Sequence, residues 1–219
     1  MPRTARIQRK TAETNIDLEI NLDGSGRVQL SYPQTYIRRM LELFGASGGF
    51  DLTLTAAGDL EVDQHHLVED TGLVLGRCFA EALGEKKGIY RCGYFFGGEG
   101  EAPDSASLPQ VRAVVDFSGR PFLVMSAGGG DFPDVLLRDE EDGSAYLTGT
   151  VQDFWQGFTA GALCNMHLDI FPAPEGSPEV ERKKEIPSLF DAAARALRAA
   201  SLRDSRAPET IPSTKGVLI

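Results

Sequence analysis

"NIDLEINLDGSGRVQLS", residues 15–31, decides the fold because a second stretch of the same form, "QVRAVVDFSGRPFLVMS", follows at residues 110–126. Each alternates apolar and polar residues about a Gly-containing turn, DGSGR in one and DFSGR in the other, which is typical of a β-hairpin. After each hairpin comes a helical segment, then a strand, then a second helix. In the first half these are QTYIRRMLELFG, FDLTLTA and DQHHLVEDTGLVLGRCFAEALG, and in the second TVQDFWQGFTAGAL, MHLDIFP and RKKEIPSLFDAAARALRAA. The chain therefore predicts one β-β-α-β-α unit used twice.

The duplication predicts an α+β protein that folds as a single domain over residues 1–219. Its two half-repeats are expected at residues 5–96 and 107–202, joined by an acidic, Gly-rich connection, with a tail at residues 203–219 that has neither helical nor strand period. Hairpins and helices combined in one unit usually bury the helices against one face of the sheet, so the fused halves are expected to pack helix on helix. The acidic loop RDEEDGS, residues 138–144, is expected to be a solvated surface turn.

Composition narrows the class of partner. Apolar residues make up 42% of the 219 residues and charged residues 25%, as in ordinary globular proteins. A net charge of −10 argues against nucleic acid as the main partner, because proteins that bind phosphate backbones need a surplus of Lys and Arg. It is compatible with a small phosphorylated ligand held by a few local cations. No apolar run approaches the roughly 20 residues needed to span a bilayer, so we expect no membrane association and a cytoplasmic location.

The three cysteines, Cys78, Cys92 and Cys164, are odd in number and lack CxxC spacing. Neither a disulfide framework nor a thiolate zinc site is indicated, and small buried residues in a reducing compartment are the simplest interpretation. His167 follows Cys164 by three residues, so a nucleophilic Cys–His pair is a minor alternative.

The segment HHLVED, residues 65–70, raises the question of a metal site. On a helix, residues three and four apart share a face, so Glu69 would lie beside both His65 and His66, whose side chains diverge by about 100°. On spacing alone these histidines are as well explained as surface groups, and His167 as a structural strand histidine. Arg120 after Gly119 is equally compatible with a solvated turn residue.

Several segments together resemble the imidazoleglycerol-phosphate dehydratase family, manganese-dependent enzymes of histidine biosynthesis. They are RKTAETNIDLEINLDGSG, GDLEVDQHHLVED, ALGEKKGIYRCG, DFSGRP, MHLDI and the terminal PSTKG, and they cover nearly the whole chain in order. The resemblance implies a tandem duplication of the ribosomal protein S5 domain 2-like type. It also implies a lyase with a small-molecule substrate, in a large hollow homo-oligomer whose metals lie at subunit contacts.

The resemblance is uneven at the metal ligands. The family takes its ligands from a DHML motif, an HHxxE motif, a strand histidine and a second HHxxE motif. Four of these positions are retained, as His65, His66, Glu69 and His167. The other four carry residues unsuited to ligation: Arg39, Lys183, Lys184 and Pro187. Because Arg stays protonated and Lys ligates only after losing its proton, we expect these cations to neutralise Glu69 instead. The expected metal content is therefore none or a single weak manganese site.

The substrate positions are better retained. By resemblance, phosphate would be held by Arg91, Arg120, Ser213 and Lys215, and Glu13 would contact the substrate. Charged hydrogen bonds from Arg and Lys suit a phosphate dianion. Two changes oppose this: Asp191 stands where the family has a lysine and would repel the phosphate, and the segment 103–105 reads PDS where the family has MDE.

Three functions follow from this pattern. The first is a repurposed lyase, isomerase or cyclase of a specialised biosynthetic pathway, which works by acid–base chemistry without the two-metal centre. Its catalytic residues would be Glu13, His65, His66, Glu69, Arg39, Lys183 and Lys184. The second is an imidazoleglycerol-phosphate dehydratase of histidine biosynthesis with a reduced metal site. The third is a non-catalytic homologue. The replacements favour the first function, because cations rather than Ala or Gly stand at the ligand positions.

Overall fold

The computed structural model describes residues 2–58, 65–97, 110–139, 142–171 and 184–218. The helices are α1 (Thr35–Gly48), α2 (His65–Leu83), α3 (Gly149–Ala162) and α4 (Glu185–Ser201). The strands are β1 (Thr4–Lys10), β2 (Thr14–Asn21), β3 (Val28–Ser31), β4 (Asp51–Gly58), β5 (Cys92–Gly97), β6 (Val111–Asp116), β7 (Phe122–Ala127), β8 (Gly130–Asp131), β9 (Leu136–Arg138), β10 (Ala145–Leu147) and β11 (Asn165–Ile170). None of the helices described here is both long and apolar enough to cross a bilayer.

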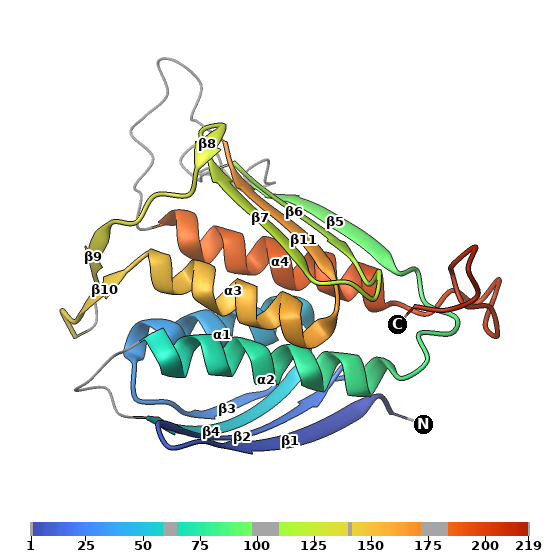
Figure 1. Ribbon diagram of the computed structural model, residues 1–219, viewed down its shortest axis with the longest axis horizontal. Coiled ribbons are helices and arrows are strands. Elements are labelled where there is room, and N and C mark those ends of the chain that lie inside the picture. The colour runs from blue at the N-terminus through green and yellow to red at the C-terminus, as the bar shows by residue number, and fades with distance from the viewer. Residues whose placement is uncertain (1, 59–64, 98–109, 140–141, 172–183, 219) are drawn as a thin grey trace.

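Two sheets enclose the four helices (Figure 1). The first sheet has the strand order β1-β2-β4-β3 and the second β5-β6-β11-β7-β8. Helices α1 and α2 pack on the first sheet and α3 and α4 on the second, while α2 packs against α3 and α1 against α4. The predicted fold class is therefore confirmed: helices cover one face of each sheet, and the two halves meet helix on helix.

The two predicted hairpins were wrong in their pairing. β2 and β3 are both strands, but β4 lies between them, antiparallel to β2 and parallel to β3. In the second sheet β11 separates β6 from β7 in the same way. Parallel neighbours need a crossover connection, which α1 supplies between β3 and β4 and α3 between β7 and β11. Apolar alternation had shown only that these strands are buried on one side.

Each sheet also has an edge strand that was not predicted, β1 in the first and β5 in the second, and the second sheet has the short β8 beside β7 as well. β1 pairs with β2, and β5 pairs with β6 in the corresponding position of the second sheet. The expected first half-repeat, residues 5–96, therefore takes in most of a strand that belongs to the second sheet. By sheet membership the division falls between Leu83 and Cys92. Superposition of the two halves residue by residue stays a prediction.

The core lies in the helix layers and on the inner faces of both sheets. Its largest buried side chains include Trp155, Phe44, Phe79 and Phe158, all fully buried. Phe79 meets Phe158 edge to face, with ring centroids 5.4 Å apart, and Trp155 meets Phe158 at 5.6 Å. The Phe79–Phe158 contact joins α2 of the first unit to α3 of the second, so the halves share one core.

A small hairpin inserted between β7 and α3 reaches the first unit. β9 and β10 pair with each other, and Tyr146 of β10 stacks on Tyr36 of α1, with ring centroids 3.5 Å apart. Asp139, expected in a solvated turn, is only 5% exposed. The prediction for this end of the acidic loop was wrong because the hairpin folds back onto α1 (Figure 1). Residues 140 and 141 lie outside the described residues.

Candidate functional site

Two of the three retained histidines, His65 and His66, lie at the start of α2 beside the loop that precedes β2. The rings of His65 and His66 have their centroids 4.5 Å apart, and His66 Nδ1 is 3.4 Å from a carboxylate oxygen of Glu13. Glu69 follows one turn later and is exposed. The structure thus brings together an imidazole and a carboxylate, the pair of groups that general acid–base chemistry uses near neutral pH.

Asp70, the last residue of HHLVED, fixes this end of α2. Its carboxylate accepts a hydrogen bond from the Thr14 hydroxyl at 2.6 Å and pairs with Arg9 at 3.0 Å. Sequence reasoning assigned no role to Asp70, because its partners lie 56 and 61 residues away along the chain. By tying α2 to β1 and β2, Asp70 holds His66 within reach of Glu13.

Arg39 does not neutralise Glu69 as expected. Its guanidinium Nη1 donates to both carboxylate oxygens of Asp139, at 3.2 and 3.1 Å. The Asp139 side chain is 1% exposed and that of Arg39 40% exposed. Pairing of Arg39 with Glu69 was the wrong expectation, because the fold brings in a nearer carboxylate. That carboxylate belongs to Asp139 at the inserted hairpin, 100 residues away in the sequence.

Asp191 likewise has a structural partner rather than a place opposite a phosphate. Its carboxylate accepts hydrogen bonds from the Ser47 hydroxyl of α1 and from Nε of Arg195, the latter at 2.9–3.0 Å. The expectation that Asp191 opposes phosphate binding is therefore not supported by its contacts. Lys184 directly precedes α4, whereas Lys183 and the segment 103–105 lie outside the described residues.

His167 lies on β11, in the middle of the second sheet. Its neighbours Met166 and Leu168 are fully buried against the helices, so His167 faces outward, where its register partners are Val114 and Val124. Cys164 is fully buried, and burial raises the pKa of its thiol to about 12. A buried, protonated thiol is a poor nucleophile, so the alternative of a Cys164–His167 pair is wrong.

Arg91 is held firmly at the other end of the molecule. Its Nε and Nη2 donate to Asp116 at 2.6 and 3.0 Å, and Nη1 donates to the carbonyl of Pro212 at 2.8 Å. Hydrogen bonding to Asp116 raises the pKa of Arg91. The next residue, Ser213, accepts a hydrogen bond from the backbone N–H of Lys215 at 3.2 Å. Arg91 and the PSTKG tail are thus neighbours, and Arg120 is exposed in the turn between β6 and β7.

The two groups of candidate residues lie far apart within one chain. His65 is the first residue of α2, while Arg91 follows the end of that helix. A helix of 19 residues is about 28 Å long. Figure 1 shows α2 and α4 spanning the molecule lengthwise, with the tail and the C-terminus at one end and the β9–β10 hairpin at the other. A single chain therefore does not assemble one pocket from the histidine and phosphate groups.

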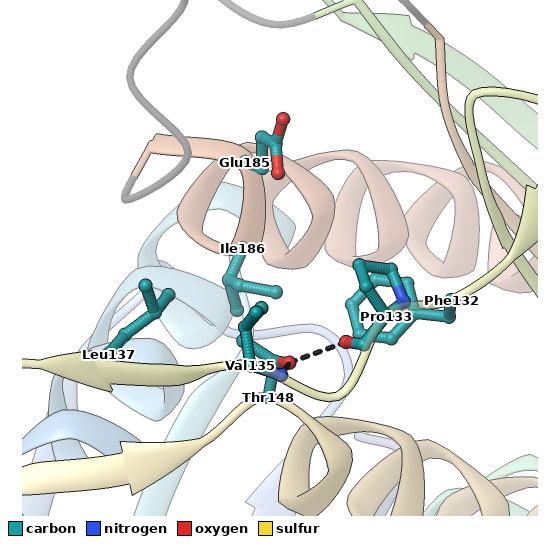
Figure 2. Close-up of a pocket in the computed structure, with 7 residues that line it drawn as sticks. All are labelled: Phe132, Pro133, Val135, Leu137, Thr148, Glu185 and Ile186. Atoms are coloured by element: carbon teal, nitrogen blue, oxygen red, sulfur yellow. Dashed lines mark hydrogen bonds between the residues drawn. The ribbon is translucent and has the colours of Figure 1, made fainter.

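The pocket in Figure 2 is not a candidate for a phosphorylated substrate. It lies between the segment from Phe132 to Leu137 and the first turn of α4, and its walls are mainly apolar. The Thr148 hydroxyl is already bonded to the Pro133 carbonyl at 2.6 Å, and Glu185 points away from the apolar side chains. The hollow offers no convergent polar groups, which a ligand site needs for orientation.

The residues present do not fit the family's complete two-metal centre. Arg39 is committed to Asp139, and neither a protonated Lys184 nor Pro187 offers a donor atom. In the part of the chain that the structure describes, no three His, Cys, Asp or Glu side chains converge. The four retained donors are divided between α2, which carries His65, His66 and Glu69, and β11, which carries His167.

Comparison with known proteins gives a consistent picture. The sequence profile named "Imidazoleglycerol-phosphate dehydratase" matches residues 33–197. The chain is similar to the imidazoleglycerol-phosphate dehydratase of Koribacter versatilis, with 41% identity over 99% of this chain and 100% of that protein. The Salinispora tropica enzyme is 38% identical over the full length of both. Among solved structures, the Pyrococcus furiosus protein, crystallised with (S)-C348, matches with a TM-score of 0.70 and 26% identity, over 96% of this chain and 99% of that one.

Proposed function

Because the chain belongs to the imidazoleglycerol-phosphate dehydratase family, we propose that it is a carbon–oxygen lyase that removes water from imidazoleglycerol phosphate in histidine biosynthesis, with a metal site reduced from the family's. The observation that supports this most is similarity along the whole chain, at 38–41% identity to proteins of that name. The acid–base pair His66–Glu13 and the phosphate residues are retained within that similarity. This favours the second of the three functions considered above over the first.

The elimination needs a base and an acid in addition to a phosphate anchor. A proton leaves one carbon, a hydroxide leaves its neighbour, and the carbon–carbon double bond forms between them. His66 would accept or return a proton, with Glu13 stabilising its protonated form at 3.4 Å. Arg91, Arg120, Ser213 and Lys215 would hold the phosphate through charged hydrogen bonds. A family metal would add charge stabilisation at the imidazole, but the residues present do not provide its full ligand set.

A second copy of the chain is needed to complete this site. The His66–Glu13 pair and the Arg91 tail lie at opposite ends of helices about 28 Å long, so they can meet only across a subunit contact. The proposal therefore includes a large homo-oligomer, in which the start of α2 from one subunit faces the tail of another. It also includes a cytoplasmic location, supported by the free thiols of Cys78, Cys92 and Cys164.

A second candidate is a repurposed lyase, isomerase or cyclase that works without the two-metal centre. The specific observation in its favour is the Arg39–Asp139 ion pair, which commits a former ligand position to a structural contact. The imidazole–carboxylate pair would then act on a different phosphorylated substrate. A non-catalytic homologue is the third outcome.

Growth of a histidine-requiring strain that lacks its own dehydratase tests the proposal directly. We expect the gene to restore growth, and His66→Ala to abolish it without lowering the amount of folded protein. The purified protein should dehydrate imidazoleglycerol phosphate, and Glu13→Gln should lower kcat. Absence of growth together with absence of turnover, at normal oligomer size, would contradict the proposal and leave the second or third function.

A further inference from the structure

The connection between α2 and β5 has an unusual backbone. Four of its residues have left-handed φ angles: Gly84 at 57°, Lys86 at 58°, Gly88 at 61° and Arg91 at 70°. Glycine adopts this region freely, but Lys and Arg do so seldom. Non-glycine residues in this region persist where surrounding contacts fix them, and such places are often functional. The two long cationic side chains are thus directed by a backbone that is held in place.

This connection binds the end of α4 and the C-terminal tail that follows it. The N–H of Arg91 donates to the Ala200 carbonyl in the last turn of α4 at 2.9 Å, and that of Tyr90 to the carbonyl of Leu202, the residue after α4, at 3.0 Å. Further along, Gly88 accepts from the N–H of residue 204 at 2.8 Å and donates to the carbonyl of residue 210 at 3.0 Å. A chain with no regular structure of its own is therefore held by backbone hydrogen bonds to the segment from Gly88 to Arg91.

Two cations extend this anchoring to the end of the tail. Arg91, oriented by Asp116, donates to the Pro212 carbonyl at 2.8 Å. Lys86 donates through Nζ to the Leu218 carbonyl at 3.2 Å, and the Lys86 residue is only 5% exposed. Ser213 and Lys215 lie between these two carbonyls in the sequence. Burying a charged side chain is costly unless it is well paired, so Lys86 is poorly explained as a surface lysine.

We propose that Lys86 and Asp116 are positioning residues, which hold the tail so that Ser213 and Lys215 form a preorganised phosphate site. Lys86 acts directly on the tail, and Asp116 acts through the guanidinium of Arg91. The anchoring itself depends only on the contacts above, while its benefit for phosphate binding rests on the proposed function. Neither residue needs to touch the substrate.

The neighbouring lysine provides a matched control. Lys87 is 44% exposed in its side chain, and its Nζ pairs at 2.6 Å with Glu85 on the surface. We compare Lys86→Met with Lys87→Met in the full chain, and include Lys86→Arg as the conservative variant. Hydrogen exchange of the amides in residues 207–218 measures the anchoring without any substrate. Steady-state kinetics with imidazoleglycerol phosphate measure its consequence.

We expect Lys86→Met to speed exchange in the tail about tenfold, as loss of one charged hydrogen bond predicts, and to raise KM by a similar factor with a smaller change in kcat. Asp116→Asn should act in the same direction, and Lys86→Arg should recover part of the protection. Lys87→Met should match the native protein in both measurements.

Gly88→Ala tests the backbone part independently of charge. A Cβ at Gly88 would lie 2.4 Å from the Pro208 carbonyl oxygen, at a φ that disfavours alanine, so it should displace the tail and speed exchange as well. Unchanged exchange in both Lys86→Met and Gly88→Ala would overturn the inference, whatever the enzyme does. If exchange changes but the native protein does not turn over imidazoleglycerol phosphate, the proposed function fails and the anchoring stands.

Discussion

Replacing Gly72 by alanine is the sharpest test of how the two halves pack. Helices α2 and α3 approach through reciprocal glycines, two on each helix. A Cβ at Gly72 would lie 2.0 Å from the Phe154 carbonyl oxygen, and one at Gly76 2.2 Å from that of Phe158. From the other side, Cβ atoms at residues 157 and 161 would lie 2.3 and 2.2 Å from the carbonyl oxygens of residues 69 and 73. The obstructing atoms are backbone, so no side-chain rotation can relieve the overlap.

The size of the effect follows from this geometry. Ordinary contact begins at 3.4 Å, so the helices would have to separate by 3.4 − 2.0 = 1.4 Å at Gly72. Overpacking of a well-filled core costs about 1–3 kcal/mol and sometimes more, because side chains such as Phe154 and Phe158 lose contacts. Alanine returns roughly 1 kcal/mol through its higher helix propensity. Because the overlap is with backbone, we take the upper value for overpacking, about 3 kcal/mol, and subtract the gain in helix propensity. The expected net loss in the free energy of unfolding is about 2 kcal/mol, or roughly 4–8 °C in Tm.

Denaturant unfolding monitored by the fluorescence of Trp155 measures this loss at fixed protein concentration. Gln156→Ala, on the exposed side of α3, is the control because it changes helix propensity without entering the contact. It should leave the free energy of unfolding within about 0.5 kcal/mol of the native value. If Gly72→Ala were as stable as the native protein, the close backbone approach of α2 and α3 would be refuted.

Three further predictions concern the Arg39–Asp139 pair, the carboxylate of Asp51 and the replaced metal ligands. Arg39→Ala should lower the unfolding free energy by about 1–2 kcal/mol, a value reduced for the exposure of Arg39, and by clearly less in an Asp139→Asn background; equal losses in both backgrounds would show that the pair is not coupled. Hydrogen bonds from Arg27 and then from backbone N–H groups lower the pKa of Asp51 below its usual 3.8. Its contribution to stability is therefore present above about pH 4 and lost as the pH falls through the lower folded-state pKa, so acid titration of Asp51→Asn should show a shallower decline than that of the native protein, and identical titrations would contradict this. Four substitutions together should restore the family's ligands and create manganese binding: Arg39→His, Lys183→His, Lys184→His and Pro187→Glu. At a manganese concentration of 100 times Kd the metal should stabilise the folded state by about 2.7 kcal/mol. Manganese should therefore raise the Tm of this variant more than it raises the Tm of the native chain.

The positions of most strands and helices, the duplication and the family could be predicted from the sequence, because residues close together in the chain determine these features. Apolar periodicity showed which segments form strands and helices, and the matched order of those segments showed the duplication, because both signals depend on neighbours a few residues apart. The resemblance at HHLVED, DFSGRP and PSTKG indicated the family, which comparison along the whole chain then showed. The pairing of His66 with Glu13 was compatible with the family resemblance, although its distance was not predicted.

The tertiary structure decided the rest, because long-range partners leave no periodic trace in a sequence. Alternation showed that β2 and β3 each bury one side, but only the crossover through α1 placed β4 between them. Replacement by arginine at residue 39 suggested neutralisation of Glu69, whereas the folded hairpin supplies a buried Asp139 as its partner. By resemblance the histidines and the phosphate residues belong to one site, whereas the length of α2 separates them within a single chain. Lys86 and Asp116 gained a role only when the fold brought the tail across them, since their partners lie 132 and, through Arg91, 121 residues away.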